Sequence, residues 1–388
     1  MQQVQVCIVG GGCVGLALAL GLAKHNVSVM VLDAGPEPQP LNEAYAARVS
    51  AISLASQSLF ESLGVWDAIK AQRATAYRKM SVCDADSFGR IQFNAQQLAL
   101  PELGHIIEND AIRYALYQAL QQHSQASLMF GSRYQSIHQT DSDVLITLEQ
   151  GMPVMAKLLV AADGANSGVR SQFKLPISFW DYDHHAIVAT IKTEQPHDAT
   201  ARQVFLPEGP LALLPLSDPH TQSIVWSTAP DHARELMEMD EQSFNKALSA
   251  ASDLQCGLCS VQGERAVFPL TMRYAQQWLT GKVVLMGDAA HTIHPLAGLG
   301  MNLGLKDAAH LIKALSEDSE EFASHRTLRE YERSRKLDAQ KHIAMMQGLK
   351  ELFSGSHPLK KLVRGVGLNV VDNLGPIKDL FVQQAIGE

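Results

Sequence analysis

The sequence predicts an α/β protein of two domains that interleave along the chain. A strand–helix–strand unit with a glycine-rich turn opens the chain, and two later apolar strands each run into a turn that pairs glycine with aspartate. Residues 186–191, 211–216 and 223–227 are apolar or alternating segments bounded by Pro, Asp or Gly, which is typical of antiparallel strands. At 388 residues a single core has stopped growing, so roughly two domains are expected.

The first motif is a dinucleotide-binding fingerprint. Two apolar strands flank an apolar helix, at residues 4–9, 27–32 and 16–23. Gly10 permits the tight turn, Gly12 lets a pyrophosphate approach N–H groups at the helix N-terminus, and Gly15 allows close helix–strand packing. Asp33 ends the second strand, where a carboxylate can accept hydrogen bonds from the two hydroxyls of an adenosine ribose. The motif indicates a dinucleotide without saying which one.

The second motif follows a strand at residues 158–162. Asp163 places a carboxylate at the strand end, and Gly164 supplies a position free of side chain. Ser167 and Arg170 add polar groups on the helical turn that follows. Taken alone, this block also fits an ordinary turn.

The third motif follows a buried strand at residues 283–286. Asp288 can bind sugar-like hydroxyls, and the glycines between 298 and 304 let backbone lie flat against a planar ring. A helix that opens near Gly300 presents unpaired N–H groups and a positive dipole end. That helix end would stabilise a flavin, which becomes anionic on reduction.

His291 and His294 are three residues apart, but no carboxylate or cysteine completes a site with metal-ligand spacing, so both are interpreted as structural. The sequence has neither a Ser-His-Asp spacing nor a Gly-x-Ser-x-Gly elbow, which argues against a hydrolase.

Composition excludes several classes of function. The net charge of −8 argues against nucleic-acid binding through bulk positive charge. No apolar run approaches the ~20 residues of a membrane-spanning helix, and the first residues show no basic or apolar stretch typical of an export signal, so the protein is expected to be neither exported nor membrane-spanning. The 5 cysteines are expected to be reduced thiols, which favours a cytoplasmic protein.

Together the three motifs resemble the single-component FAD aromatic hydroxylases related to p-hydroxybenzoate hydroxylase. Six further stretches resemble the ubiquinone-biosynthesis hydroxylases of that superfamily, at residues 48–52, 179–190, 201–205, 214–220, 331–336 and 346–355. The resemblance implies an FAD-binding Rossmann-like domain of the glutathione reductase type, an interleaved antiparallel β-sheet substrate domain and C-terminal helices. It implies an FAD-binding domain from 1–71, 101–175 and 265–345, a substrate domain from 72–100 and 176–264, and a C-terminal helical segment over 346–388.

The resemblance also implies which residues hold FAD. The ADP half would contact Gly10, Gly12, Gly15 and Asp33, and the phosphates or ribityl chain would contact Arg48 and Arg113. Pyridine nucleotide and pyrophosphate would pass Asp163 and Gly164, the phosphate–ribityl linkage would bind Asp288, and the isoalloxazine edge would approach Gly300, Met301, Asn302 and Leu303. Singly, Arg48 and Arg113 would be interpreted as surface residues.

No phenol-activating acid or base is identified from the sequence. Pro295 is a candidate for orienting the aromatic ring and His291 for polar support. Two positions depart from the family pattern: Asp33 replaces the more usual Glu, and Leu299 replaces a Gln between two glycines. The first shortens the carboxylate's reach, and the second removes a polar group beside the flavin.

The activity implied is hydroxylation of a polyprenylphenol ring, first at C5 after decarboxylation, with NAD(P)H and O2 and through a flavin hydroperoxide. Alternatives are hydroxylation of another ring position or phenol, a flavin-dependent isoprenoid reductase, and a non-catalytic flavin-binding subunit of a biosynthetic complex. NADH and NADPH are not distinguished.

The partners implied are other ubiquinone-biosynthesis proteins and the inner face of the membrane, where a polyprenylated substrate resides. Leu359, Leu362, Val363 and Val366 share one helical face with Lys360, Lys361 and Arg364 off it. Such a segment suits an anionic membrane surface or a partner protein, and equally a helix docked on the core.

Overall fold

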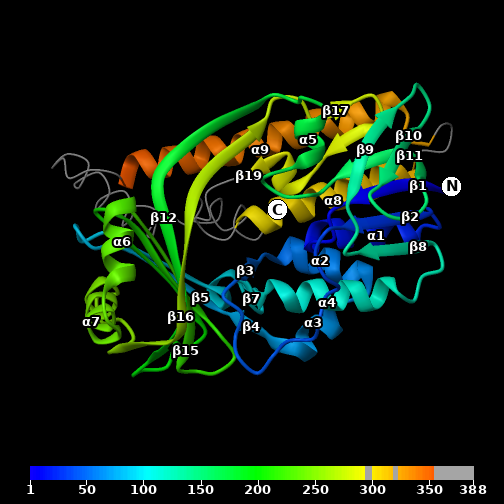
Figure 1. Cartoon of the computed structure of the whole chain (residues 1–388). Coiled ribbons are helices and arrows are strands. Elements are labelled where there is room, and N and C mark those ends of the chain that lie inside the picture. Colours follow the sequence, from blue (N-terminus) through cyan, green and yellow to red (C-terminus); the bar gives the residue numbers. More distant parts are fainter. Residues whose placement is uncertain (293–298, 318–321, 354–388) are drawn as a thin grey trace.

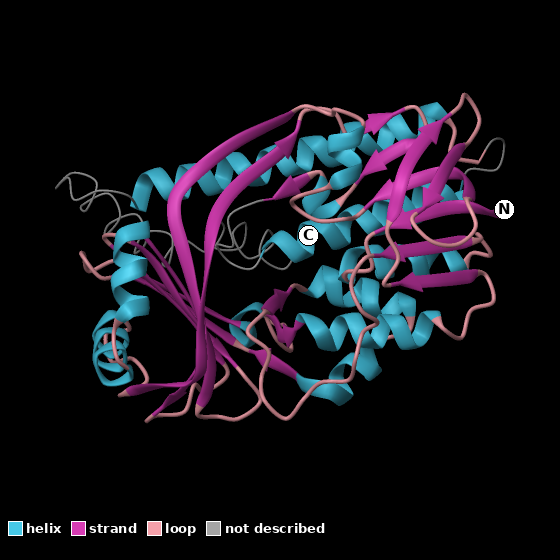
Figure 2. Ribbon diagram, viewed as in Figure 1, coloured by secondary structure: helices cyan, strands magenta, loops and turns pink. Residues whose placement is uncertain are grey.

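An eight-stranded sheet carries the strand–helix–strand unit at the N-terminus. The computed structural model describes residues 1–292, 299–317 and 322–353, and Figures 1 and 2 show its arrangement. The helices are α1 Cys13–Lys24, α2 Leu54–Leu63, α3 Trp66–Arg73, α4 Asn109–Leu120, α5 Gly168–Gln172, α6 Pro230–Glu238, α7 Glu241–Ala251, α8 Leu299–Glu317 and α9 His325–Phe353, with 3-10 turns η1 Ala95–Leu98 and η2 Gly287–Ala289.

The first sheet contains β1 Gln2–Val9, β2 Val29–Asp33, β8 Ala126–Phe130, β9 Tyr134–Gln139, β10 Val144–Leu148, β11 Val154–Ala161, β17 Leu279–Thr280 and β18 Val283–Leu285. Strands β8, β2, β1, β11 and β18 lie side by side and run parallel. The predicted strands at 4–9, 27–32, 158–162 and 283–286 are confirmed to within a few residues. Their carboxyl ends meet at one edge, so the three sequence motifs come together there.

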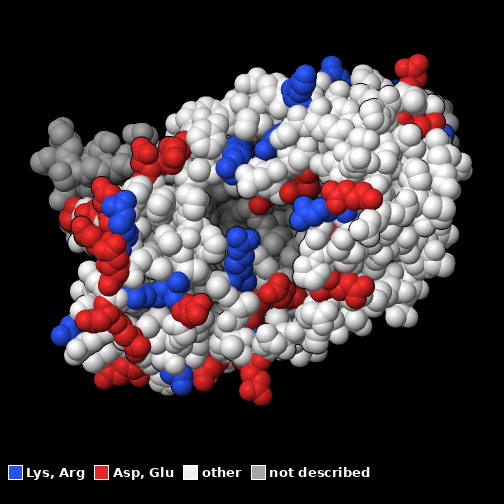
Figure 3. Space-filling model, viewed as in Figure 1, with Lys and Arg blue, Asp and Glu red and all other residues white. Residues whose placement is uncertain are grey.

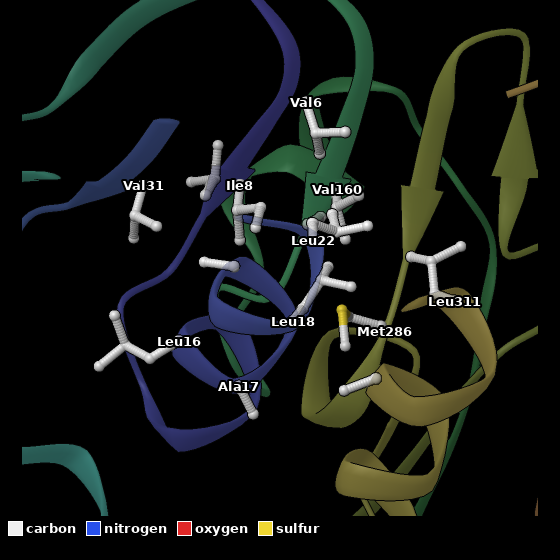
Figure 4. Close-up of a cluster of buried hydrophobic side chains, with 14 of the residues drawn as sticks. Val6, Ile8, Leu16, Ala17, Leu18, Leu22, Val31, Val160, Met286 and Leu311 are labelled. Atoms are coloured by element: carbon white, nitrogen blue, oxygen red, sulfur yellow. The ribbon is translucent and has the colours of Figure 1, made fainter. Parts of the chain in front are cut away.

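Helix α1 carries apolar side chains on every side, which is typical of a helix that other elements enclose. It packs against α4 and α8, and its side chains gather with those of β1 and β11 in the core shown in Figure 4. Leu16, Leu18, Leu20 and Leu22 are all fully buried. Each buried leucine contributes about 1.5–3 kcal/mol, so this core fixes the turn that precedes α1.

The second sheet contains β5 Lys79–Asp84, β6 Arg90–Asn94, β12 Ile177–Thr193, β13 Thr200–Leu206, β14 Gly209–Pro215, β15 Thr221–Thr228, β16 Cys259–Ala275 and β19 His291–Thr292. All neighbouring pairs are antiparallel except β13 with β5. The expected antiparallel strands at 186–191, 211–216 and 223–227 are confirmed within β12, β14 and β15. In Figure 1, the long strands β12 and β16 extend from the rest of this sheet toward the first sheet and α5.

One face of the second sheet packs on α6 and α7 and forms a separate hydrophobic core. A third sheet consists of β3 Val49–Ile52, β7 Gly104–Glu108 and β4 Ala74–Tyr77, with β7 between the other two strands. The expected domain ranges remain a prediction, and the boundary expected at residue 265 falls within β16. The amphipathic segment expected around residues 359–366 lies outside the described residues.

Candidate active site

A cavity of about 740 Å³ lies between the first and second sheets. The face drawn in Figure 3 is hollowed, with charged side chains of both signs around the hollow. We call one side of the cavity the glycine-turn wall, which includes Gly12, Gly164, Asp288 and Gly300. We call the other side the sheet wall, which includes Met80, Ala201, Gln203, Ala212, Leu214 and Val225.

The first turn of the glycine-turn wall is closely packed at two of its three motif glycines. A Cβ on Gly10, where φ is 114°, would lie 2.2 Å from the Ala162 carbonyl oxygen, and one on Gly15 would lie 2.0 Å from the Gly10 oxygen. A Cβ on Gly12 would meet no atom within 4 Å. Gly10 and Gly15 therefore maintain the turn itself, whereas Gly12 leaves the cavity open.

Asp33 and Arg113 brace this turn from behind. The Asp33 carboxylate accepts hydrogen bonds from the backbone N–H groups of Gly11 at 2.5 Å and Gly35 at 2.6 Å. Arg113 Nε donates to the Gly11 carbonyl oxygen at 2.7 Å, and its guanidinium lies 5.5 Å from the Phe130 ring centroid. Arg113 also lines the cavity, whereas Asp33 is not among the lining residues.

Arg48 links the two sides of the cavity. It lines the cavity with an exposed side chain, and its guanidinium carbon lies 5.1 Å from the ring centroid of Phe268 on β16. A cation over an aromatic face is favourable, so Arg48 connects the glycine-turn side to the second sheet.

The second motif is tied to the third through Arg170. Its Nη1 donates to the Ala289 carbonyl oxygen at 2.7 Å, and Nη2 donates to that of Ala165 at 2.8 Å. Asp163 accepts from the Val169 N–H at 3.1 Å through Oδ2, while its buried Oδ1 has no partner within the described ranges. Gly164 lines the cavity, and a Cβ there would again meet no atom within 4 Å.

Asp288 follows β18 and faces the cavity. Its surroundings desolvate the carboxylate and raise its pKa, although the charges of His291 and Arg48 act in the opposite direction. The residue is exposed to the cavity even though protein surrounds it, so a bound ligand can reach it there.

His291 lies in a buried charged cluster and does not line the cavity. Its Nε2 donates to Asp307 Oδ2 at 2.6 Å, and Arg335 Nε donates to Asp307 Oδ1 at 2.7 Å. Both His291 and Asp307 side chains are fully buried. The Gly287 N–H also donates to Asp307 Oδ2, at 2.9 Å, so the Asp307 cluster of His291, Asp307 and Arg335 anchors the turn that carries Asp288.

Burial alone would raise the pKa of Asp307, but the charges of His291 and Arg335 and the hydrogen bonds from both outweigh it, so the pKa is lowered. The motif analysis missed Asp307 and Arg335. The sequence carried a signal, because Leu303, Asp307 and Leu311 are four residues apart and a helix puts them on one face. The structure shows that all three are buried. A carboxylate at such a position requires buried partners.

The four α8 residues of the third motif divide between two environments. Gly300 and Met301 line the cavity. Asn302 instead accepts from the Ser53 N–H at 3.0 Å and donates to the Ala51 carbonyl oxygen at 2.7 Å, and Leu303 is buried in the first core. Pro295 and His294 lie outside the described residues, as does the side chain of Leu299.

The sheet wall is mostly apolar. Besides the residues that define it, Pro210 and Phe268 contribute apolar surface, and Tyr77 of β4 lies at the cavity as well. Burial raises the pKa of Tyr77 to about 12, so its phenol group stays neutral at physiological pH. The cavity thus joins a backbone-rich polar wall to an apolar one.

Comparison with known proteins gives one family and many relatives. Residues 3–345 match the family described as FAD binding domain. The chain is 36% identical over 394 residues to 3-demethoxyubiquinol 3-hydroxylase of Escherichia coli (strain K12), covering 100% of this chain and 99% of the relative. It is 36% identical over 428 residues to the mitochondrial ubiquinone biosynthesis monooxygenase COQ6 of Homo sapiens, covering 96% and 90% of the two chains.

Solved structures share the fold. The p-nitrophenol 4-monooxygenase of Pseudomonas putida superposes with a TM-score of 0.82 at 20% identity, over 100% of this chain and 99% of that one. A ternary complex of aklavinone-11 hydroxylase with FAD and aklavinone gives a TM-score of 0.70 at 22% identity, over 89% of this chain and 68% of that one.

Proposed function

The chain belongs to the FAD-binding ubiquinone-biosynthesis hydroxylases, and on that premise we propose that it hydroxylates the aromatic ring of a polyprenylphenol. It is an FAD-dependent aromatic monooxygenase, whose reaction takes O2 and a reduced nicotinamide. The observation that carries the proposal is the single cavity that joins the glycine-turn wall to the apolar sheet wall. Such a cavity can hold a planar ring against a bound dinucleotide cofactor.

The glycine-turn wall fits FAD. A Cβ on Gly12, Gly164 or Gly300 would meet no atom within 4 Å, so backbone is open there to a pyrophosphate or a planar ring. We assign the ADP half to Gly10, Gly12, Gly15 and Asp33, the phosphates and ribityl chain to Arg48, Arg113, Asp163, Gly164 and Asp288, and the ring edge to Gly300 and Met301, with Asn302 and Leu303 supporting that turn from behind. FAD bound there would supply the redox chemistry: it would accept electrons from NAD(P)H, activate O2 and deliver one oxygen atom to a ring carbon.

The chain's own groups bind, orient and shield. Leu214, Val225 and Phe268 on the second sheet would exclude water from the ring and hold it against the opposite wall. The first turn of α8, at Gly300 and Met301, would place unpaired N–H groups and a positive dipole end where negative charge develops. His291 would act only by holding the Asp288 turn through Asp307.

We propose the C5 position of a decarboxylated polyprenylphenol as the site of hydroxylation. A second position is favoured by one specific finding, the 36% identity over the full chain to a relative named 3-demethoxyubiquinol 3-hydroxylase. In that case the substrate would carry more ring substituents, and the sheet wall would have to accommodate them.

Mass spectrometry of quinone-pathway intermediates in aerobic cells lacking this protein tests the proposal and the position. Accumulation of a polyprenylphenol without the first new ring oxygen supports C5, and accumulation of a demethoxy intermediate supports the second position. Unchanged intermediates with normal quinone would refute both.

Two further readouts separate the alternative functions. Incorporation of oxygen-18 from O2 into product distinguishes a hydroxylase from an isoprenoid reductase. Substrate-stimulated oxidation of NAD(P)H by the purified protein distinguishes an enzyme from a flavin-binding subunit.

We further propose a cytoplasmic location with peripheral contact at the inner face of the membrane, together with other ubiquinone-biosynthesis proteins. A polyprenyl tail partitions into the bilayer, so the enzyme must meet its substrate there. Among the described helices, none is both long and apolar enough to span a membrane. Flotation with anionic lipid vesicles measures this contact.

A further inference from the structure

The two faces of the second sheet have opposite environments. On β14 and β15, Leu211, Leu213, Ile224 and Trp226 point to the core formed with α6 and α7. The alternate residues Ala212, Leu214 and Val225 point into the cavity. Because successive side chains of a strand point to opposite faces, each cavity-facing residue is placed by its neighbours in the core.

Gln203 of β13 interrupts the apolar character of the sheet wall. Gln203 lines the cavity together with its neighbours Ala201 and Arg202, whereas Val204 is fully buried. Gln203 lies opposite Ala212 on β14, which in turn lies opposite Val225 on β15, so the amide stands in an apolar row. The residue is only 8% exposed.

The Gln203 amide has no hydrogen-bond partner among the residues that the structure describes. Backbone pairing of β13 uses the main-chain groups of Gln203 and leaves both side-chain polar atoms free. Neither amide atom belongs to the fully buried atoms without a partner in the described residues, so the amide reaches the open space of the cavity. Both amide atoms are therefore available to a ligand group in the cavity.

Three arginines line the cavity, and each makes contacts within the protein. Arg202 Nη1 donates to the His197 and Thr200 carbonyl oxygens, and Arg113 donates to those of Gly11 and Pro36. Arg48 stacks on Phe268. Within the row of Gln203, Ala212 and Val225, the polar group is an uncharged amide, which can hydrogen-bond a phenol hydroxyl and carries no charge to balance a carboxylate.

We infer that Gln203 hydrogen-bonds the ring hydroxyl of the substrate and selects a phenol without a ring carboxylate. The assignment rests on the proposed function, because it supposes that the ring lies against the sheet wall. Gln203 fixes the rotation of the ring within an otherwise apolar site, which aims one ring carbon at the opposite wall.

The test measures equilibrium binding of 2-geranylphenol and its deoxy analogue geranylbenzene to the full-length FAD-loaded protein. Gln203→Met keeps the length of the side chain and removes the amide, and Gln203→Leu gives a second apolar replacement. Gln262→Met makes the same change at an exposed position of β16 and serves as the control. Melting temperature and FAD content are measured for every variant.

The wild-type protein and Gln262→Met should bind the phenol about tenfold more tightly than geranylbenzene. Gln203→Met should lose this difference, with weaker phenol binding and unchanged or tighter binding of geranylbenzene. Its KM should rise, and a larger share of NAD(P)H should be consumed without product. 3-Geranyl-4-hydroxybenzoate, which carries a ring carboxylate, should bind the wild-type protein at least tenfold more weakly than the phenol.

Three outcomes overturn the assignment: unchanged phenol preference in Gln203→Met, equal loss of both ligands, or tight binding of the carboxylated analogue. If the wild-type protein hydroxylates the phenol in those cases, the proposed function stands and only the role of Gln203 falls. If FAD-loaded wild-type protein neither binds nor hydroxylates the phenol, the proposed function falls with it.

Discussion

The glycine-turn wall is largely backbone held by buried polar contacts, whereas the sheet wall is a row of alternating side chains. On the first, Gly15 packs directly on Gly10, and Asp307 binds the N–H of Gly287. On the second, Ala212 and Val225 face open space while their neighbours fill a core. Substitutions at the packed contacts that hold the glycine-turn wall should therefore reduce folding and cofactor binding together, and substitutions on the sheet wall should change ligand choice alone.

The largest effect is expected from Asp307→Ala. It would leave the buried Arg335 and His291 without their shared carboxylate, which should lower the free energy of unfolding by about 3–5 kcal/mol and reduce bound FAD. Urea denaturation and FAD content measure this. Asp338→Ala is the control, because Asp338 pairs with the same Arg335 but is 28% exposed, and it should cost no more than about 1 kcal/mol. Equal losses in both variants would contradict a special role for Asp307.

Gly15→Ala and Gly12→Ala should separate turn packing from cofactor space. Gly15→Ala places a Cβ against backbone and should destabilise the apoprotein by about 3 kcal/mol. Gly12→Ala meets open space and, as a helix N-cap change, should cost at most about 1 kcal/mol while lowering FAD affinity about tenfold or more. Thermal unfolding of apoprotein and FAD titration give the two readings. Wild-type FAD affinity in Gly12→Ala would refute the placement of the pyrophosphate.

Acid should weaken the glycine-turn wall through Asp307. Its lowered pKa means that the unfolded chain binds this proton at higher pH than the folded chain does. The stability it provides is present above the ordinary aspartate pKa of about 3.9 and is lost as pH falls below that value and through the lowered pKa of the folded state, by at most about 1.4 kcal/mol per pH unit. Asp307→Asn should flatten this slope in urea denaturation between about pH 5 and 2.5. Parallel slopes for wild type and variant would show that other groups dominate.

Ala212→Leu tests the sheet wall. The added side chain projects into the cavity beside Gln203, so stability should change by less than about 1 kcal/mol and FAD content should stay constant. The KM for a prenylphenol should rise about tenfold or more, since the ring loses space. Ala212→Ser, which keeps the volume small, is the control. A parallel loss of FAD would mean that the walls do not act separately.

The smallest effect is expected at Tyr45. This residue lies between β2 and β3 and contacts the loop that joins β14 to β15. Its hydroxyl lies 2.5 Å from Ser217 Oγ and accepts the Asp218 N–H at 3.3 Å, while Arg73 stacks on its ring. Tyr45→Phe should lower stability by about 0.5–1 kcal/mol, because these groups are near solvent. The melting temperature measures it. A loss above about 2 kcal/mol would show that this contact organises both walls.

Much of the glycine-turn wall could be predicted because its parts are contiguous in sequence. Each motif pairs a buried strand with the turn that follows it, and the parallel sheet brings the carboxyl ends of β1, β11 and β18 together. The strand positions, the start of α8 near Gly300 and the antiparallel strands of the second sheet are confirmed. The contacts of Gly10, Gly12, Gly15, Asp33 and Asp288 with FAD stay predictions.

The placement of His291, Asn302 and Gln203 required the tertiary structure. Spacing puts His291 and Asn302 inside a motif, but their partners Asp307 and Ser53 come from distant elements, and those partners turn both side chains away from the cavity. Alternation along β13 tells that Gln203 and Val204 point to opposite faces, without telling which face is covered by helices.

By itself the sequence determined the fold class, the dinucleotide turn and the family, since glycine spacing and strand hydrophobicity act over a few neighbouring residues. Only the tertiary structure decided which face of the second sheet α6 and α7 bury and which face remains open to the cavity. That choice depends on packing between segments far apart in the chain, and it leaves the amide of Gln203 free to meet a ligand.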